Sequence, residues 1–300
     1  MREDIVLLDG AAGTSLWAKT EDKVAVWRYN IEQPEIVKEI MQEYVDAGCE
    51  YVLANTFGAN RTAMKKIRPS KTNKAQGIRK PDYNPTMIVT EAMKLAHEVL
   101  DGKAKIMLSA GPLTGLIEPY GDITEEECRE YYQEMLSAGM AVGADLIYLQ
   151  TFMDLKMMQI AVGVAKQFDV PVFCSMSFED NGRTLMGNSP KDIVEGLTPL
   201  GIDAIGINCS LGPDMALPIV KEFSELTDLP LVYKPNAGKP ILDANGQEQT
   251  AFDIETFTDD VMKALEYNVK YVGGCCGSDA SYMKRLREKI DAKKEELGYK

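Results

Sequence analysis

Three cysteines carry the clearest chemical signal in this sequence. Cys209 lies in the segment INCS, and Cys275 and Cys276 are adjacent in the segment GGCCG. Each follows a run of β-forming residues that breaks into serine or glycine. Three thiolates without a fourth protein ligand are typical of a zinc site that keeps one position open. Catalytic zinc sites keep such a position, whereas structural sites are closed by four ligands.

The alternative is that these residues are core cysteines, because free cysteine is among the most buried residue types. Cys49, Cys128 and Cys174 fit that alternative, since each lies inside a helix or strand pattern. The glycines and the asparagine that flank the other three favour a site instead.

The elements that would position these cysteines alternate along the whole chain. Amphipathic helical segments separate the strand-like runs, and eight strand-then-helix units without a break in composition predict a single-domain (β/α)8 TIM barrel over residues 1–300. A doubly wound open sheet is the alternative. The expected strands are Ile5–Asp9, Tyr51–Thr56, Lys105–Ala110, Asp145–Thr151, Pro171–Phe178, Ala204–Ser210, Pro230–Pro235 and Lys270–Gly274, and the expected helices include Gln33–Ala47, Thr124–Val142, Asp253–Tyr267 and Ala280–Glu296.

In that arrangement Cys209 falls at the carboxyl end of the sixth strand and Cys275-Cys276 at the end of the eighth. Barrel active sites lie at the carboxyl ends of the strands. We therefore expect the three sulfur atoms to meet at one mouth of the barrel, although the residues are far apart in the sequence.

Composition excludes several other classes of protein. The chain has 300 residues, a hydrophobic share of 45% and a net charge of −13, which argue against disorder and against general binding to nucleic acid or to a membrane surface. The start, MREDIVLLDG, lacks the shape of a signal peptide, and no apolar run approaches the roughly 20 residues that span a bilayer. Six cysteines in a chain of this length indicate reduced thiols, so we expect a cytoplasmic protein.

Five segments together give the sequence a family resemblance. They are LLDGAAGT at 7–14, ANTFGAN at 54–60, GINCSLGP at 206–213, KPNAGKPI at 234–241 and VGGCCG at 272–277. The sequence resembles the homocysteine S-methyltransferase family, and within it the homocysteine-binding module of cobalamin-dependent methionine synthase. The resemblance implies a (β/α)8 barrel with Zn²⁺ held by Cys209, Cys275 and Cys276. It also implies that the thiol of homocysteine completes the tetrahedron and is methylated to methionine.

Elementary thiol chemistry agrees with that mechanism. A free thiol has a pKa near 8.5 and is mostly protonated at neutral pH, whereas coordination to zinc deprotonates it. No protein base is therefore needed beside the substrate sulfur. The single histidine, His97, lies in a helical pattern away from any strand end, and no catalytic triad can be built from it.

Several polar residues at other strand ends are candidates for substrate binding. The glycines after the first strand let the backbone approach a ligand closely, and Asp9 or backbone amides could hold the polar end of an amino acid. Amides at the other strand ends could bind substrate or orient the cysteine loop. The candidates are Asp9, Gly10, Thr14, Asn55, Gln150, Asn208 and Asn236.

One of these candidates departs from the family. After the fourth strand the family usually carries Glu-Thr, and that carboxylate is expected to pair with the substrate ammonium. This chain has Gln150-Thr151. A charge-assisted hydrogen bond is about twice as strong as a neutral one. Either another acid such as Asp154 substitutes, or the acceptor is a thiol other than homocysteine.

A basic stretch follows the second strand. It contains eight cations and no acid between Arg61 and Lys80. One interpretation is a solvated, mobile loop. The other is a docking surface for an acidic corrinoid protein, or for a phosphate-bearing or polyglutamylated donor. The residues assigned to docking are Lys71, Lys74, Arg79 and Lys80.

The chain has no evident room for folate-binding or cobalamin-binding modules, so we expect the methyl donor to come from outside. It would be methylcobalamin on a separate corrinoid protein, which the resemblance favours, or a small onium compound such as S-methylmethionine or betaine. Two other functions stay open: methyl transfer involving a different thiol or methylated compound, and a non-catalytic zinc barrel that serves as a subunit.

Overall fold

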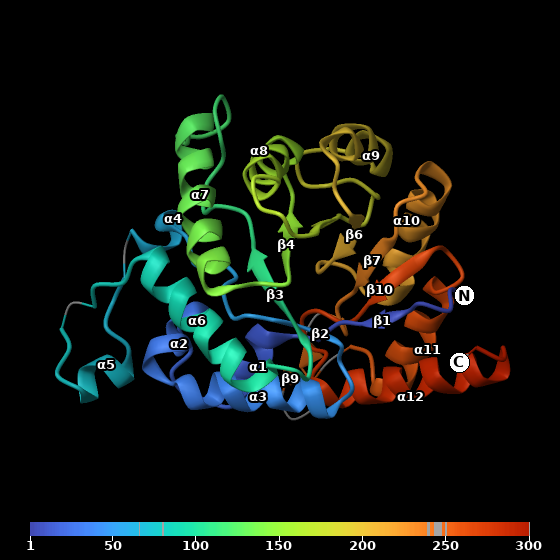
Figure 1. Ribbon diagram of the computed structural model, residues 1–300, viewed down its shortest axis with the longest axis horizontal. Coiled ribbons are helices and arrows are strands. Elements are labelled where there is room, and N and C mark those ends of the chain that lie inside the picture. The colour runs from blue at the N-terminus through green and yellow to red at the C-terminus, as the bar shows by residue number, and fades with distance from the viewer. Residues whose placement is uncertain (66, 80, 239–240, 243–247, 250, 300) are drawn as a thin grey trace.

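A closed parallel barrel forms the centre of the computed structural model (Figure 1). The structure describes residues 1–65, 67–79, 81–238, 241–242, 248–249 and 251–299. Eight strands lie in the order β1-β10-β7-β6-β5-β4-β3-β2, and all their pairings are parallel. A parallel bridge between Leu8 and Tyr51 joins the first strand to the last and closes the ring. The predicted barrel is confirmed, and the open doubly wound sheet is wrong.

The strands lie where the sequence predicts them, and most are shorter by one to three residues at their ends. Hydrogen-bonded pairing stops earlier than the β-forming composition does. The strands are β1 (Val6–Leu7), β2 (Tyr51–Leu53), β3 (Lys105–Ala110), β4 (Leu146–Phe152), β5 (Val172–Met176), β6 (Ala204–Asn208), β7 (Leu231–Lys234) and β10 (Val269–Val272). The expected eighth strand is thus β10.

Helices surround the barrel, and neighbouring helices pack against one another around the whole ring, with α12 returning to α3. Capping side chains fix where many of them begin; Thr124 and Glu127 form a capping box at α7. The helices are α1 (Ala12–Ala18), α2 (Tyr29–Glu32), α3 (Pro34–Asp46), α4 (Arg61–Met64), α5 (Lys71–Ala75), α6 (Pro85–Leu100), α7 (Glu125–Val142), α8 (Leu155–Ala165), α9 (Pro190–Leu197), α10 (Pro213–Leu226), α11 (Ile254–Ala264) and α12 (Ala280–Glu296).

The interior of the barrel has an apolar part and a polar part. Eight buried residues form the apolar cluster: Leu8, Leu53, Met107, Leu146, Tyr148, Phe173, Ala204 and Val232. Side chains alternate along a strand, so residues two or four positions later point to the same side. Those positions hold polar residues at the carboxyl ends of the strands: Asn55, Ser109, Gln150, Ser175, Asn208 and Lys234. The barrel therefore presents a polar layer at one end.

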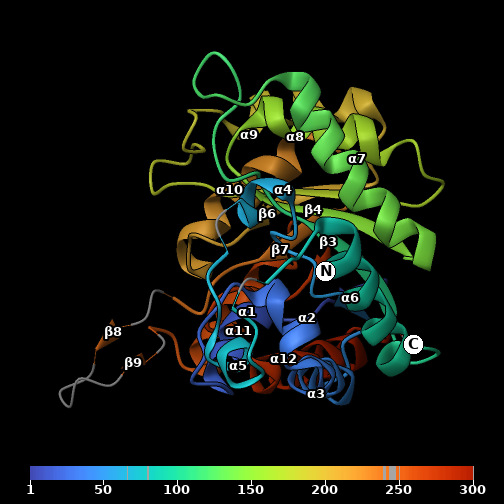
Figure 2. The ribbon, with the colours of Figure 1, turned by 90° about the vertical axis from the view of Figure 1, so that its left-hand side faces the viewer.

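Two features were not expected from the sequence. A separate antiparallel pair, β8 (Ile241–Leu242) with β9 (Glu248–Gln249), follows β7 and lies outside the barrel sheet (Figure 2). The basic stretch contains two short helices, α4 and α5, and α5 begins with a capping box formed by Ser70 and Asn73. In the described part of the chain, no helix is long and apolar enough to cross a membrane.

Candidate metal and substrate site

The three sequence-predicted cysteines meet at the carboxyl end of the barrel. Cys209 directly follows β6, and Cys275 and Cys276 follow β10. Their sulfur atoms all lie within 4.8 Å of one another, and the Sγ atoms of Cys209 and Cys276 are 3.9 Å apart. Cys49, Cys128 and Cys174 are buried elsewhere, as expected. Among the described residues, Cys209, Cys275 and Cys276 form the one group of potential metal ligands that the structure brings together.

The cysteine loop is held in an uncommon backbone conformation. Cys209, Ser210 and Thr151 all have φ between 61° and 64°, in the left-handed region that residues other than glycine rarely adopt. Asn208 braces this turn. Its Oδ1 accepts from the backbone N–H of Thr151 at 2.7 Å and from the Ser175 hydroxyl at 2.5 Å, and its Nδ2 donates to the Thr151 hydroxyl at 2.7 Å. The same Nδ2 lies 4.0 Å from the Cys275 sulfur. Asn208 therefore links the cysteine loop to β4 and β5.

The three thiols strongly shift one another's pKa values. Hydrogen bonds from Cys275 and Cys276 lower the pKa of Cys209 to about 3. The same contacts with Cys209 raise the pKa of Cys276 to about 11 and raise that of Cys275 well above its usual value. One thiolate thus forms readily, and further deprotonation requires a positive charge at the cluster.

A cavity of about 390 Å³ opens onto the sulfur atoms. Its walls are largely apolar and include the aromatic side chains Trp17, Trp27 and Phe57, all from segments that follow β1 and β2. Of the candidate substrate residues, Gly10, Thr14, Asn55 and Gln150 line the cavity together with the three cysteines. Asp9, Asn208 and Asn236 are not among the lining residues, although the Asn236 side chain contacts Cys209.

Asp9 forms a buried ion pair that sequence reasoning did not anticipate. Its Oδ1 accepts from Lys234 Nζ at 2.5 Å, and both side chains are 1% exposed. Its Oδ2 accepts from the backbone N–H of Leu53 at 2.8 Å. Lys234 also lies over the ring of Tyr148, with Nζ 5.9 Å from the centroid. Both oxygens of Asp9 are thus engaged by the protein.

Gln150 is buried in the polar layer, and its Nε2 donates to the Ser109 hydroxyl at 2.7 Å. Asp154, the acid considered as a substitute for the family's glutamate, lies elsewhere. It caps α8 by accepting from the backbone N–H groups of Lys156 and Met157. Asp154 does not line the cavity, so that explanation of Gln150 is wrong.

The remaining candidates have mainly structural contacts. A side chain at Gly10 would place its Cβ 2.2 Å from the carbonyl oxygen of Ser278, so only glycine fits there. The Thr14 hydroxyl accepts from the backbone N–H of Gly277, and Asn55 donates to Val26 and Asn30. The Oδ1 of Asn236 is buried and has no hydrogen-bond partner.

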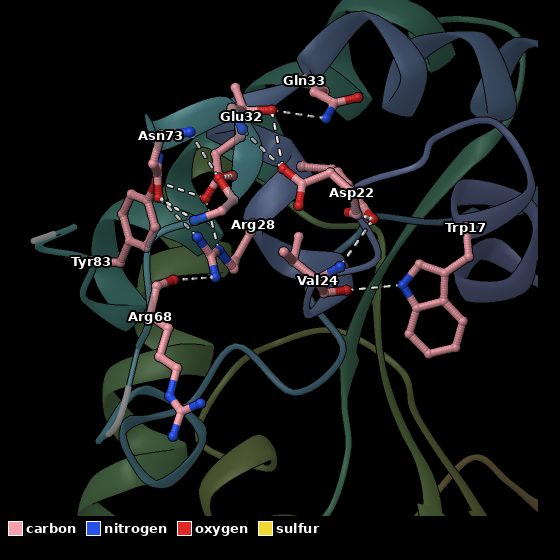
Figure 3. A network of polar contacts seen from close by, with 12 residues as sticks. Trp17, Asp22, Val24, Arg28, Glu32, Gln33, Arg68, Asn73 and Tyr83 are labelled. Atoms are coloured by element: carbon pink, nitrogen blue, oxygen red, sulfur yellow. Dashed lines mark hydrogen bonds and ion pairs between the residues drawn. The ribbon is translucent and has the colours of Figure 1, made fainter. Parts of the chain in front are cut away.

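The basic stretch is anchored beside the mouth. Figure 3 shows Arg28 at the centre of a polar network, where it donates to Glu32, to the carbonyl of Arg68 and to Asn73 of α5. Ser70 and Tyr83 also donate to Glu32. The network continues through Asp22 and Val24 to Trp17 at the rim of the cavity (Figure 3).

Three basic side chains of this stretch face solvent. Lys71, Lys74 and Arg79 are exposed; Lys71 lies 3.5 Å from Glu21, which is itself 95% exposed. Lys80 lies outside the described residues. His97 lies on α6 and contacts the carbonyl of Gly143, away from the cavity, as expected.

Sequence reasoning missed Lys234, Ser109 and Ser175. The signal that could have found them is alternation, since each follows an interior residue by two positions. That signal is weak because strands of a parallel barrel are buried on both faces and read as continuous apolar runs.

Replacing Asn208 with alanine tests whether it braces the cysteine loop. We expect metal affinity to fall about 10- to 100-fold, as for other residues that orient metal ligands. Competition with a chromophoric chelator measures that affinity. The control is Asn84→Ala, which removes the cap of α6 and should cost about 1 kcal/mol of stability with metal affinity unchanged. Native affinity in Asn208→Ala would contradict the bracing role.

The chain is a closed α/β barrel with a cluster of three thiols, which could hold a metal ion, at its carboxyl end. Comparison with known proteins identifies the family. The model of the family described as homocysteine S-methyltransferase matches residues 6–290. The chain belongs to the homocysteine S-methyltransferase family.

Among curated relatives, the methionine synthase of Mycobacterium tuberculosis is 28% identical over 306 residues, which cover 95% of this chain and 24% of that protein. The methionine synthase of Mycobacterium leprae is also 28% identical, over 86% of this chain and 21% of its own length. This chain therefore spans about a quarter of the length of these relatives.

Solved structures agree on the fold. The homocysteine methyltransferase MmuM from Escherichia coli in its metallated form superposes with a TM-score of 0.74 at 20% identity, over 95% of this chain and 96% of that one. Its oxidized form gives 0.76 at 19% identity with the same coverage.

Proposed function

We propose that this protein is a zinc-dependent S-methyltransferase that methylates homocysteine to methionine, with Zn²⁺ held by Cys209, Cys275 and Cys276. The observation that carries the proposal is the cluster of three sulfur atoms that lines a largely apolar cavity. Family membership supports the reaction.

The spacing of the sulfur atoms fits the metal. Zinc–sulfur bonds of about 2.3 Å at tetrahedral angles place two sulfur ligands about 3.8 Å apart. The 3.9 Å between Cys209 and Cys276 agrees with that value. The raised pKa values of Cys275 and Cys276 also fit, because a divalent cation is what removes their protons.

When bound, zinc would deprotonate an acceptor thiol and keep its sulfur nucleophilic at neutral pH. The chain's own residues do the rest. Asn208 holds the cysteine loop, and Trp17, Trp27 and Phe57 provide apolar walls beside the reacting sulfur. Among the described lining residues, the one basic side chain is Lys234, which is ion-paired with Asp9, and a deprotonated sulfur needs no base.

The methyl group comes from outside the barrel in this proposal. The likeness to methionine synthases favours a separate methylcorrinoid protein over a small onium donor. Free thiols at the site are consistent with a reducing compartment, so we place the enzyme in the cytoplasm. An acidic carrier would meet the exposed cations of α5 as it approaches the mouth.

Neutralising Lys71, Lys74 and Arg79 with glutamine tests this approach. At low salt we expect methyl transfer from an acidic corrinoid protein to slow about tenfold, and its dependence on ionic strength to flatten. Steady-state rates between low and physiological salt measure both effects. The control replaces three exposed lysines of α10, α11 and α12, namely Lys221, Lys263 and Lys284, which changes the net charge equally. Unchanged kinetics at low salt would remove the docking role.

A donor screen tests the function. Zinc-loaded protein is incubated with homocysteine and, in turn, with methylcobalamin, a methylcorrinoid protein, S-methylmethionine or betaine, and methionine is measured. We expect methionine from at least one donor and none after zinc is removed. Methionine formation would exclude the non-catalytic zinc barrel, and its absence with every donor would contradict the proposal.

A further inference from the structure

The cavity offers a ligand very few charged side chains. Apart from the cysteines, the one ionisable side chain among the described lining residues is Lys234. None of those residues carries a carboxylate. An acceptor that brings a positive ammonium group into this cavity therefore meets a lysine and no acid.

Asp9 does not supply the missing acid. Lys234 neutralises one of its oxygens at 2.5 Å, and the backbone N–H of Leu53 occupies the other. Asp9 is 1% exposed and is not among the cavity-lining residues, whereas its partner Lys234 is, so a substrate ammonium meets the lysine first. Lys234 is fixed between Asp9 and the ring of Tyr148. In effect, the lysine side chain already provides the ammonium that Asp9 binds.

Gln150 and Asp154 do not supply it either. Gln150 is neutral, and its amide is bonded to Ser109, while Asp154 is committed to the start of α8. The nearby walls are apolar and include Trp27, which is 3% exposed. Transferring an ammonium group from water into such surroundings without a countercharge is unfavourable, whereas an uncharged methylene costs nothing comparable.

We propose that Lys234 and Gln150 make this barrel selective for acceptor thiols that lack an ammonium group. This inference rests on the proposed zinc-dependent S-methylation and changes its preferred acceptor: homocysteine can still be methylated, but a thiol without an ammonium group is the better acceptor. Lys234 acts as a specificity-determining residue because it removes Asp9 from the set of groups available to a ligand. Gln150 acts in the same direction because it replaces a charge with an amide.

Calorimetric titration of zinc-loaded protein with two matched thiols tests the inference. The thiols are homocysteine and 4-mercaptobutanoate, which is homocysteine without its amino group. We expect the native chain to bind 4-mercaptobutanoate more tightly than homocysteine. Equal binding of the two thiols, or tighter binding of homocysteine, by the native chain would overturn the inference.

Gln150→Glu restores a carboxylate to the cavity and gives a second test. We expect the preference to shift toward homocysteine by about tenfold or more, the scale on which an ion pair exceeds a neutral hydrogen bond. Gln167→Glu, the same change at an exposed position after α8, should leave the preference unchanged. No shift in Gln150→Glu would contradict the role of Gln150.

The two proposals fail in different ways. If both thiols bind and are methylated but the native chain prefers homocysteine, the selectivity is wrong and the methyltransferase stands. If neither thiol binds to the zinc-loaded protein, both proposals fail. Because binding is measured without a methyl donor, the choice of donor does not affect either result.

Discussion

Replacing Cys275 with alanine is expected to abolish stoichiometric zinc and, with it, methyl transfer. Zinc bound at protein sites of four ligands contributes about 10–16 kcal/mol of apparent binding free energy. The loss of one ligand in four then costs about 3 kcal/mol or more, which is a fall in affinity of at least about 100-fold. Metal analysis after gel filtration and chelator competition measure it.

The control for this change is Cys174→Ala. Cys174 is fully buried on β5 and belongs to the apolar core. Its removal leaves a small cavity and lowers stability, but zinc binding should match that of the native chain. Equal zinc content in Cys275→Ala and Cys174→Ala would contradict the assignment of the metal site.

Replacing Lys234 with methionine is expected to give the largest loss of stability of any single change discussed here. The variant leaves Asp9 as a buried, unpaired carboxylate that is 1% exposed. Breaking a buried ion pair in this way typically costs about 3–5 kcal/mol. Urea denaturation measures the loss as a shift in the free energy of unfolding.

Two controls separate the ion pair from the packing of the lysine side chain. The double variant Asp9→Asn with Lys234→Met removes both charges and should recover most of the lost stability, because buried pairs are often replaceable by neutral groups. Lys270→Met breaks a surface pair with Asp4, which is half exposed, and should cost less than about 1 kcal/mol. A single Lys234→Met variant as stable as Lys270→Met would refute the buried pair.

Much of the fold could be predicted because its signals are local. Capping residues such as Thr124 and Ser189 mark helix starts, and β-forming runs mark strands. The pair β8–β9 was missed because its strands are two residues each, too short to show a pattern. The network around Arg28 was missed because two of its partners, Arg68 and Asn73, lie 40 and 45 residues away and no local rule relates them.

The site, too, could be predicted only in part. The cysteines could be placed because each ends a strand, and the strand ends of a barrel converge. The ion-pair partner of Asp9 could not be predicted, because Lys234 lies on a strand 225 positions further along the chain. The resemblance showed that Gln150 stands where the family has a carboxylate. The consequence for substrate selectivity depends on Lys234, which only the closed barrel brings next to Asp9.

In the proposed mechanism, three protein sulfurs hold zinc and leave one position for a thiol. X-ray absorption at the zinc edge tests it most directly. Zinc-loaded protein should show three sulfur ligands, and a fourth zinc–sulfur contact should appear when an acceptor thiol is added. Four sulfur ligands before the thiol is added, or no change on adding either homocysteine or 4-mercaptobutanoate, would contradict the claim.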